Sequence, residues 1–184
     1  PEAVSATGSA EAADTSDDAG ASGTEAAYKA SDVMFLQMMV TQEKETAELI
    51  EMVKGKKVSE QTRTLTAAIK ATQEDEADDM VSWLRQRKQS TKADPDPAMH
   101  THHGGSTALT AADLAELRRA RGTDFERQML NVLLGQQHNA IELARTTTEA
   151  DGDPWVKKLA QQVDRSRTAE VAEMLKMVAR IPAV

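Results

Sequence analysis

The stretch DVMFLQMMVTQEKETAELIEMV, residues 32–53, carries the pattern that decides the fold. Residues on one face recur at alternating steps of four and three, which is the spacing of a packed helix: Phe35, Met39, Gln42, Thr46, Leu49 and Val53. Ser31 and Asp32 are suitable N-cap residues, and Gly55 is a suitable end. The pattern therefore predicts a long helix from about residue 31 to this glycine.

Three further stretches have the same spacing and predict three more long helices. Their faces carry Leu65, Ile69, Thr72, Glu76, Met80 and Trp83 in the second, Met129, Leu133, Gln136, Ala140 and Leu143 in the third, and Leu159, Val163, Ser166, Glu170, Met174 and Met177 in the fourth. DGDP, residues 151–154, predicts the last turn, with Pro154 at the first helical position. Between the second and third helices, DPDPAMHTHHGG excludes a regular element. TAADLAELRRA then predicts a short helix capped by Thr110 and followed by Gly122.

The two halves of the chain resemble each other at a shift of 94 residues. This shift superposes four pairs on the predicted faces: Leu36 on Leu130, Gln42 on Gln136, Glu76 on Glu170, and Met80 on Met174. A single helical hairpin cannot bury its apolar face alone, so two hairpins are expected to pack together. The sequence predicts an all-α, antiparallel four-helix bundle over residues 29–184. Its hairpins cover about 31–88 and 123–180, and a linker with the short extra helix covers about 89–122.

Residues 1–28 differ from the rest of the chain because small residues, acids and glycine dominate them. Almost nothing in this segment could be buried, so we predict a disordered acidic linker. Such linkers often join a secreted domain to a signal segment or lipid anchor that has been removed, although a cytoplasmic protein can carry one too. The expected location is secreted or extracytoplasmic, with a tether through the linker.

Composition excludes several classes of function. The net charge of −8 argues against nucleic-acid binding, which needs clustered Lys and Arg. The absence of cysteine excludes a disulfide scaffold, a thiolate metal site and a cysteine nucleophile. No run of about 20 apolar residues is present, so no membrane span is expected.

Polar residues stand on the predicted faces where Leu or Met would be expected. They are Gln42, Glu76, Gln136 and Glu170. The hydroxyls of Thr72 and Ser166 are expected at similar positions along the bundle axis, and the neighbouring polar residues are Glu43, Gln73, Gln137 and Arg167. A buried polar group without a partner costs about 1–3 kcal/mol, so this layer must be hydrogen-bonded, hydrated or filled by a ligand. A structural layer that sets helix register is one interpretation. A di-iron site is not expected, because no Glu-x-x-His motif is present.

The predicted helices resemble a known family. Residues 32–52 and GTDFERQMLNVLLGQQHNAIELA, residues 122–144, resemble the two signature helices of the bacterial domain-of-unknown-function family numbered 305, in which an acid, an aromatic and paired methionines precede His-His. ATQEDEADDMVSWL and SRTAEVAEMLKMV resemble the family's returning helices, with Arg167 in place of a Gln. The resemblance implies a ferritin-like four-helix bundle, an extracytoplasmic location and copper binding by the His-His pairs.

At the two His-His positions this chain has Gln42-Glu43 and Gln136-Gln137, and His138 follows one residue later. Imidazole is a good ligand for copper and a carboxamide is a poor one, so we predict that the core has lost most of its affinity for transition metals.

A second candidate metal site lies in the loop between the two halves. Met99, His100, His102 and His103 supply a thioether and three imidazoles, which suit copper or zinc. The alternative is a solvent-exposed cluster with only adventitious affinity. The methionines on the helix faces are better explained as core filler than as a copper path.

The sequence thus predicts a secreted bundle of unknown physiological role, associated with copper or zinc if the loop binds metal. The alternative is a metal-free interaction or scaffold bundle with a purely structural polar layer. An enzyme that uses Glu76 and Glu170 as acid and base is a third hypothesis, but no nucleophile or Gly-rich phosphate loop accompanies them, so no enzyme is expected. No partner is indicated, and a homodimer stays open.

Overall fold

The computed structural model describes residues 28–93 and 109–182, and these residues form helices and connections without a strand. The long helices are α1 (Ala30–Glu51), α2 (Glu60–Gln86), α4 (Gly122–Glu149) and α5 (Pro154–Arg180), and the short helix is α3 (Ala111–Arg119). A 3₁₀ helix, Met52–Gly55, continues α1 to the predicted glycine. The predicted all-α class is confirmed.

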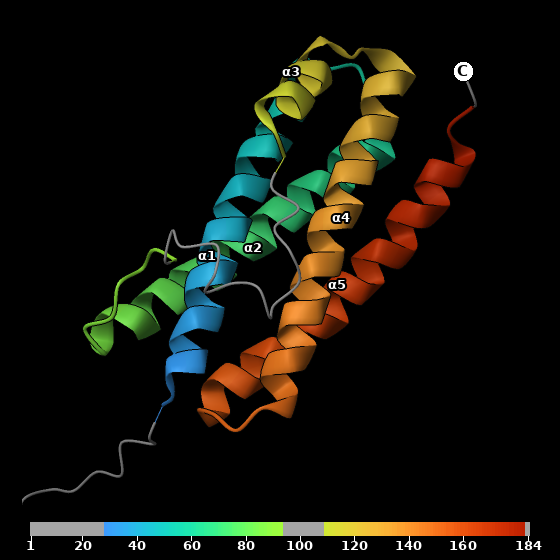
Figure 1. Ribbon diagram of the computed structural model, residues 1–184. Helices are drawn as coiled ribbons and strands as arrows, with labels where there is room; N and C mark the ends of the chain where they lie inside the picture. The colour runs from blue at the N-terminus through green and yellow to red at the C-terminus, as the bar shows by residue number, and fades with distance from the viewer. Residues whose placement is uncertain (1–27, 94–108, 183–184) are drawn as a thin grey trace, which may run out of the picture.

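Two helical hairpins lie side by side, and α1 of the first packs along α4 of the second (Figure 1). The start of α1 lies at the α4–α5 turn, where the backbone N–H of Asp153 donates to Asp32 Oδ2 at 3.0 Å. The start of α4 lies at the α1–α2 connection, where the Ser59 N–H donates to Glu126 Oε1 at 3.2 Å. Helices α1 and α4 therefore run in opposite directions. Helix α3 lies at the α1–α2 connection, where Lys56 Nζ donates to the Ala120 carbonyl at 2.8 Å.

Local capping explains where several helices begin. Thr110 caps α3 as predicted, and its Oγ1 accepts from the Asp113 N–H at 3.1 Å. Asp153 caps α5, with Oδ1 accepting from the Trp155 N–H at 2.8 Å. The prediction for α1 was wrong, since its N-cap is Lys29 rather than Ser31 or Asp32. Asp32 lies inside the first turn because its carboxylate accepts from the Lys29 N–H at 2.7 Å and from Asp153 across the bundle.

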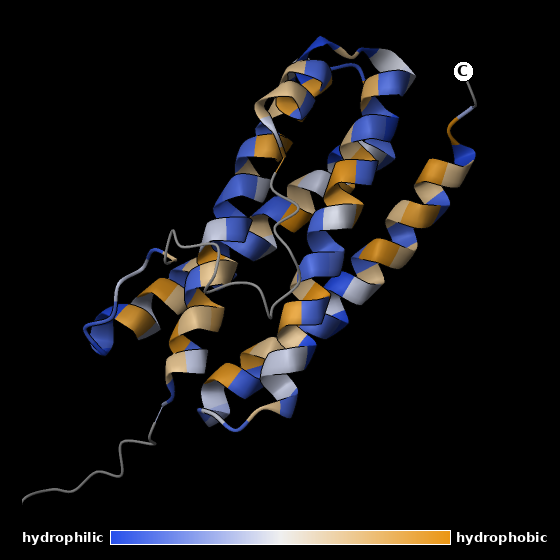
Figure 2. Cartoon of the chain, viewed as in Figure 1, coloured by the Kyte–Doolittle hydropathy of each residue, from blue (hydrophilic) through white to orange (hydrophobic). Residues whose placement is uncertain are grey.

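The core consists of two apolar clusters along the length of the bundle. One contains Phe35, Leu36, Met39, Met80 and Val163, and the other contains Leu49, Phe125, Met129, Leu133 and Met174. Met39, Met80, Met129 and Met174 are fully buried in these clusters, as core filler would be. Polar residues interrupt the apolar ones along every long helix (Figure 2). None of the helices in the described ranges combines the length and apolar character that crossing a bilayer requires.

Candidate functional site

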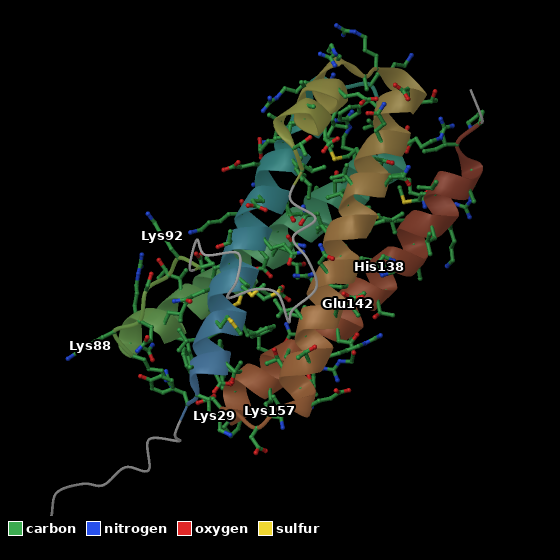
Figure 3. The ribbon with its side chains drawn as sticks, viewed as in Figure 1. Lys29, Lys88, Lys92, His138, Glu142 and Lys157 are labelled. Atoms are coloured by element: carbon green, nitrogen blue, oxygen red, sulfur yellow. The ribbon has the colours of Figure 1, made fainter. Side chains whose placement is uncertain are left out.

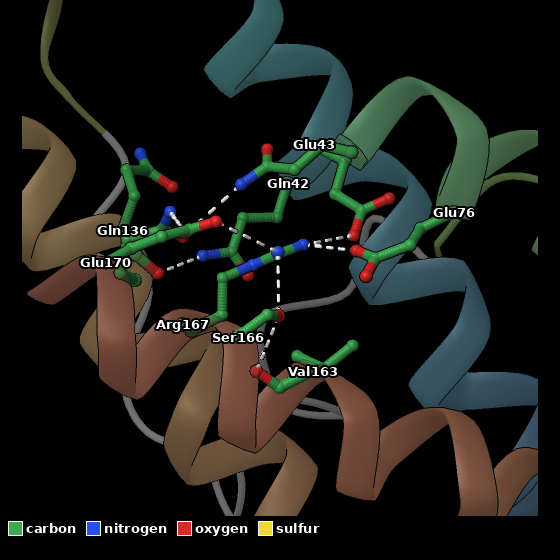
Figure 4. A network of polar contacts seen from close by, with 10 residues as sticks. Gln42, Glu43, Glu76, Gln136, Val163, Ser166, Arg167 and Glu170 are labelled. Carbon is green, nitrogen blue, oxygen red and sulfur yellow. Dashed lines mark hydrogen bonds and ion pairs between the residues drawn. The ribbon is translucent and has the colours of Figure 1, made fainter. Parts of the chain in front are cut away.

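A buried guanidinium lies among the polar residues of the long helices. Arg167 on α5 has 0% of its surface exposed, and Nη2 donates to Glu43 Oε1 on α1 at 3.1 Å and to Glu76 Oε2 on α2 (Figure 4). Its Nη1 donates to Ser166 Oγ at 3.2 Å and lies 3.7 Å from Glu170 Oε1. One cation thus joins α1, α2 and α5 through carboxyl groups.

Helix α4 joins this arrangement through amides. Gln137 Nε2 donates to Glu170 Oε2, and Gln73 Nε2 on α2 donates to Gln137 Oε1 at 3.3 Å. Gln42 Nε2 on α1 donates to the backbone carbonyl of Gln136 (Figure 4). All four long helices therefore contribute. We call Glu43, Gln73, Glu76, Gln137, Arg167 and Glu170 the polar core cluster.

The predicted helix faces are displaced by one residue at three positions. Gln42 and Ser166 are only partly buried and Thr72 is exposed, while the next residue along the chain is buried in each case: Glu43, Arg167 and Gln73 respectively. The apolar stripe on α1 is wide, since Leu49 and Ile50 are both buried, so either member of a polar pair can face inwards. The structure places the remaining predicted polar residues within or beside the core, with Glu76, Gln136 and Gln137 buried and Glu170 partly buried.

The sequence pattern predicts Arg167 only beside the polar layer, whereas the structure places it at the centre of the polar core cluster. A signal was available, because Val163, Arg167, Val171 and Met174 follow one another at helical steps of four and three, and all four are buried. An arginine in such a series requires carboxylate partners, and the opposing helices supply them.

Burial changes the protonation of the cluster. It raises the pKa of Glu43 to about 9, against the lowering effect of Arg167 and with a further raising effect from Glu76. Burial also raises the pKa of Glu170, again opposed by Arg167. Glu43 is therefore protonated at neutral pH, which reduces the negative charge around the single guanidinium.

The residues at the positions where the family resemblance implies copper ligands do not fit a copper ion. Gln42, Gln136 and Gln137 offer amides, and the Glu43 carboxyl already contacts Arg167. A metal ion placed among Glu43, Glu76 and Glu170 would be repelled by the guanidinium, which stays charged at any ordinary pH. Within residues 28–93 and 109–182, no group of three or more His, Asp or Glu side chains is arranged to hold a metal ion.

The histidines are placed apart from this cluster. His138 is exposed on α4, on the same helix as Glu142 (Figure 3), so it neither binds a core metal nor belongs to the polar core cluster. The predicted loop site, Met99, His100, His102 and His103, lies outside the residues that the structure describes. Metal binding by that loop therefore stays a prediction.

The model of one protein family, Domain of unknown function (DUF305), matches residues 32–178. The chain belongs to the DUF305 family. A crystal structure of a DUF305 fragment from Deinococcus radiodurans is similar, with a TM-score of 0.73 and 20% identity over 83% of this chain and 98% of that one. A "putative secreted protein DUF305" from Streptomyces coelicolor also has a TM-score of 0.73, with 22% identity over 81% of this chain and 92% of that one. No curated protein matches the chain.

These comparisons show that this DUF305 chain shares the fold of the two solved structures, and the suspected family is confirmed. At about one identical residue in five, the likeness extends to the fold alone. The family carries no assigned function, so a function for this DUF305 protein must be argued from its own residues.

Proposed function

We propose that this DUF305 protein is an extracytoplasmic, non-catalytic helical bundle whose core is independent of metal and which acts as a binding or scaffold module. The observation that carries the proposal is the buried Arg167 guanidinium between the carboxyls of Glu43 and Glu76. It provides the positive charge that a metal ion would provide in a carboxylate-lined bundle core. A permanent internal cation leaves a bound metal with no electrostatic role at this position.

The same contacts argue against the hypothesis of an enzyme that uses Glu76 and Glu170. Glu76 is bonded to Arg167 and Glu170 to Gln137, so both carboxyls are committed to the protein itself. A general acid or base must instead reach a proton on a substrate. We therefore assign the polar core cluster to holding the four long helices in register.

Two observations support an extracytoplasmic location. The similar protein from Streptomyces coelicolor is described as a "putative secreted protein", and residues 1–28 have the acidic, small-residue composition of a tether. A domain held outside the cytoplasm by such a tether would contact its partners through its surface, as a binding or scaffold module does.

Calorimetric titration with Cu(I), Cu(II) and Zn(II) tests the metal-independent core. The full chain and a His100→Ala/His102→Ala/His103→Ala variant are compared, so that the loop and the core are separated. We expect the triple variant to bind none of the three ions stoichiometrically, whether or not the loop of the parent chain binds one. Tight stoichiometric binding in the triple variant would place a metal site elsewhere in the protein and overturn the proposal.

An Arg167→Gln substitution in the triple variant provides a second arm. It removes the competing cation and leaves the glutamates in place. Metal binding that appears only after this change would show that Arg167 normally fills the position, as proposed. Stoichiometric metal binding of the same affinity with and without Arg167 would contradict the proposed role of this residue.

A further inference from the structure

A groove of about 540 Å³ lies between the C-terminal part of α2 and the N-terminal turn of α5. Its lining includes Asp79, Ser82 and Gln86 of α2, Arg87 directly after α2, and Trp155 of α5. Its volume is within the range of about 300–1,000 Å³ that is usual for small-molecule sites. By the rise of 1.5 Å per residue in a helix, Trp155 lies about 18 Å along α5 from Arg167. The groove is therefore separate from the polar core cluster.

Three of the five aromatic residues of the protein lie at or beside this groove. Only 3% of the chain is aromatic, yet both tryptophans and the single tyrosine meet here. The rings of Trp83 and Trp155 are stacked, with centroids 6.2 Å apart and an interplanar angle of 15°, and Tyr28 meets Trp83 edge-on at 5.4 Å. Trp155 keeps 38% of its surface exposed, so its indole is available to a ligand.

Polar groups beside these rings are incompletely satisfied. The Arg87 guanidinium lies 3.9 Å from the centroid of Trp83, and its Nη1 donates to the Trp83 carbonyl at 3.5 Å. Its Nη2 lies 3.8 Å from Asp153 Oδ2, which is too long for a hydrogen bond. Within the described ranges, neither Arg87 Nε nor the buried indole Nε1 of Trp83 has a hydrogen-bond partner. On the same helix end, Asp79, Ser82 and Gln86 add a carboxylate, a hydroxyl and an amide to the lining.

The charges of the lining narrow the class of ligand. Asp79 and Asp153 repel an anion, and Arg87 lies 3.8 Å from Asp153. A neutral ligand with both donors and acceptors can use the negative and the positive side chains together. Such a ligand must offer both hydrogen-bond donors and acceptors to Asp, Arg, Ser and Gln side chains, and an apolar face to an indole ring. Sugar rings combine these properties, because their hydroxyls lie at the rim and their C–H groups form a face.

We infer that the groove bounded by Asp79, Arg87 and Trp155 binds a short neutral oligosaccharide. Trp155 provides the stacking platform, and Asp79, Gln86 and Arg87 bond the hydroxyls. This goes beyond the proposed function by naming a ligand class, and it rests on residues that the polar core cluster does not use.

Intrinsic fluorescence tests this inference directly, because the only two tryptophans of the chain are in contact with each other at the groove. The full chain is titrated with cellohexaose, chitohexaose and maltohexaose, and calorimetry checks any response. We expect a saturable change in tryptophan emission with at least one of the three. Failure of all three to bind at millimolar concentration by either method would overturn the inference.

Three variants and two small ions sharpen the result. Trp155→Ala and Asp79→Ala should each weaken oligosaccharide binding by about tenfold or more, as expected for loss of an aromatic contact or of a hydrogen bond to a carboxylate. Leu175→Ala is the matched control, because Leu175 is also exposed on α5, at 54%, and does not line the groove. Circular dichroism confirms that each variant is folded. Unchanged affinity in Trp155→Ala, or saturation by choline or citrate in place of the sugars, would contradict the assignment.

Discussion

Asp32 Oδ2 accepts the backbone N–H of Asp153 at 3.0 Å, although the two residues are 121 positions apart in the chain. Asp153 in turn caps α5, so an acid in the first turn of α1 supports the start of the last helix. The residues shifted by 94 positions make the corresponding contact, since Glu126 on α4 accepts the N–H of Ser59, the cap of α2. Each hairpin therefore supplies a carboxylate that supports the second helix of the other.

Asp32→Ala should lower the free energy of unfolding by about 1–3 kcal/mol, because two backbone N–H groups lose their acceptor. Chemical denaturation measures the change. Asp75→Ala serves as a control, since Asp75 is exposed on α2. Equal stability of Asp32→Ala and the parent chain would show that the contact across the bundle contributes nothing.

Gly152→Ala should destabilise the protein because a Cβ at this position would clash with the Asp32 carboxylate. The carboxylate would have to leave its two N–H partners to make room. The effect should be much smaller in an Asp32→Ala background, where the carboxylate is absent, and a double-mutant cycle measures this coupling. Additive effects of the two substitutions would contradict the steric explanation.

Glu126→Ala should cost about 1–3 kcal/mol, because Glu126 Oε1 accepts from Thr62 Oγ1 at 2.5 Å as well as from Ser59. Thermal unfolding monitored by circular dichroism gives the shift in Tm. Glu116→Ala, an exposed glutamate on α3, should leave Tm nearly unchanged. A comparable loss in both variants would show that helix propensity, and not the contact with α2, is responsible.

Arg167→Met should destabilise the bundle by about 3–5 kcal/mol at neutral pH, since it leaves buried carboxyls without their cation. Adding Glu43→Gln and Glu76→Gln should recover part of the loss, because the uncompensated carboxyls are then gone. Denaturant titration of the single and triple variants tests both statements, with Arg165→Met as the control at an exposed position on α5. A stable Arg167→Met protein would mean that the ion pairs do not hold the core.

Stability should fall as the pH rises from about 4.5 to about 9. The pKa of Glu43 is raised from 4.5 in the unfolded chain to about 9 in the folded protein, chiefly by burial. Its contribution is therefore complete below pH 4.5 and is lost as the pH rises through the folded pKa. Glu43→Gln mimics the protonated form and should flatten this part of the profile of unfolding free energy against pH. Glu142→Gln, exposed on α4, should retain the slope of the parent chain.

The helices and their ends were largely predictable because their signals are local. The alternating spacing from Phe35 to Val53 predicts α1, Thr110 caps α3, and Pro154 begins α5 where the pattern places it. Apolar periodicity depends only on the backbone repeat of a helix, so it can be recognised in the sequence without knowing which other helices pack against it. The presence of a polar layer was predictable for the same reason, since polar residues interrupt the apolar faces.

Which polar residue faces the core was decided by tertiary structure. Neighbouring residues on a helix differ by about 100° in direction, and a wide apolar stripe admits either one. The choice of Glu43 over Gln42 therefore depended on Arg167, which lies 124 residues away in the chain and on another helix. The stacking of Trp83 on Trp155 and the bond from Asp153 to Asp32 likewise join distant segments. Local periodicity determined the helices of this protein. The partners of its buried charges were determined only when the helices packed, because Coulomb attraction and hydrogen bonds act between side chains on different helices.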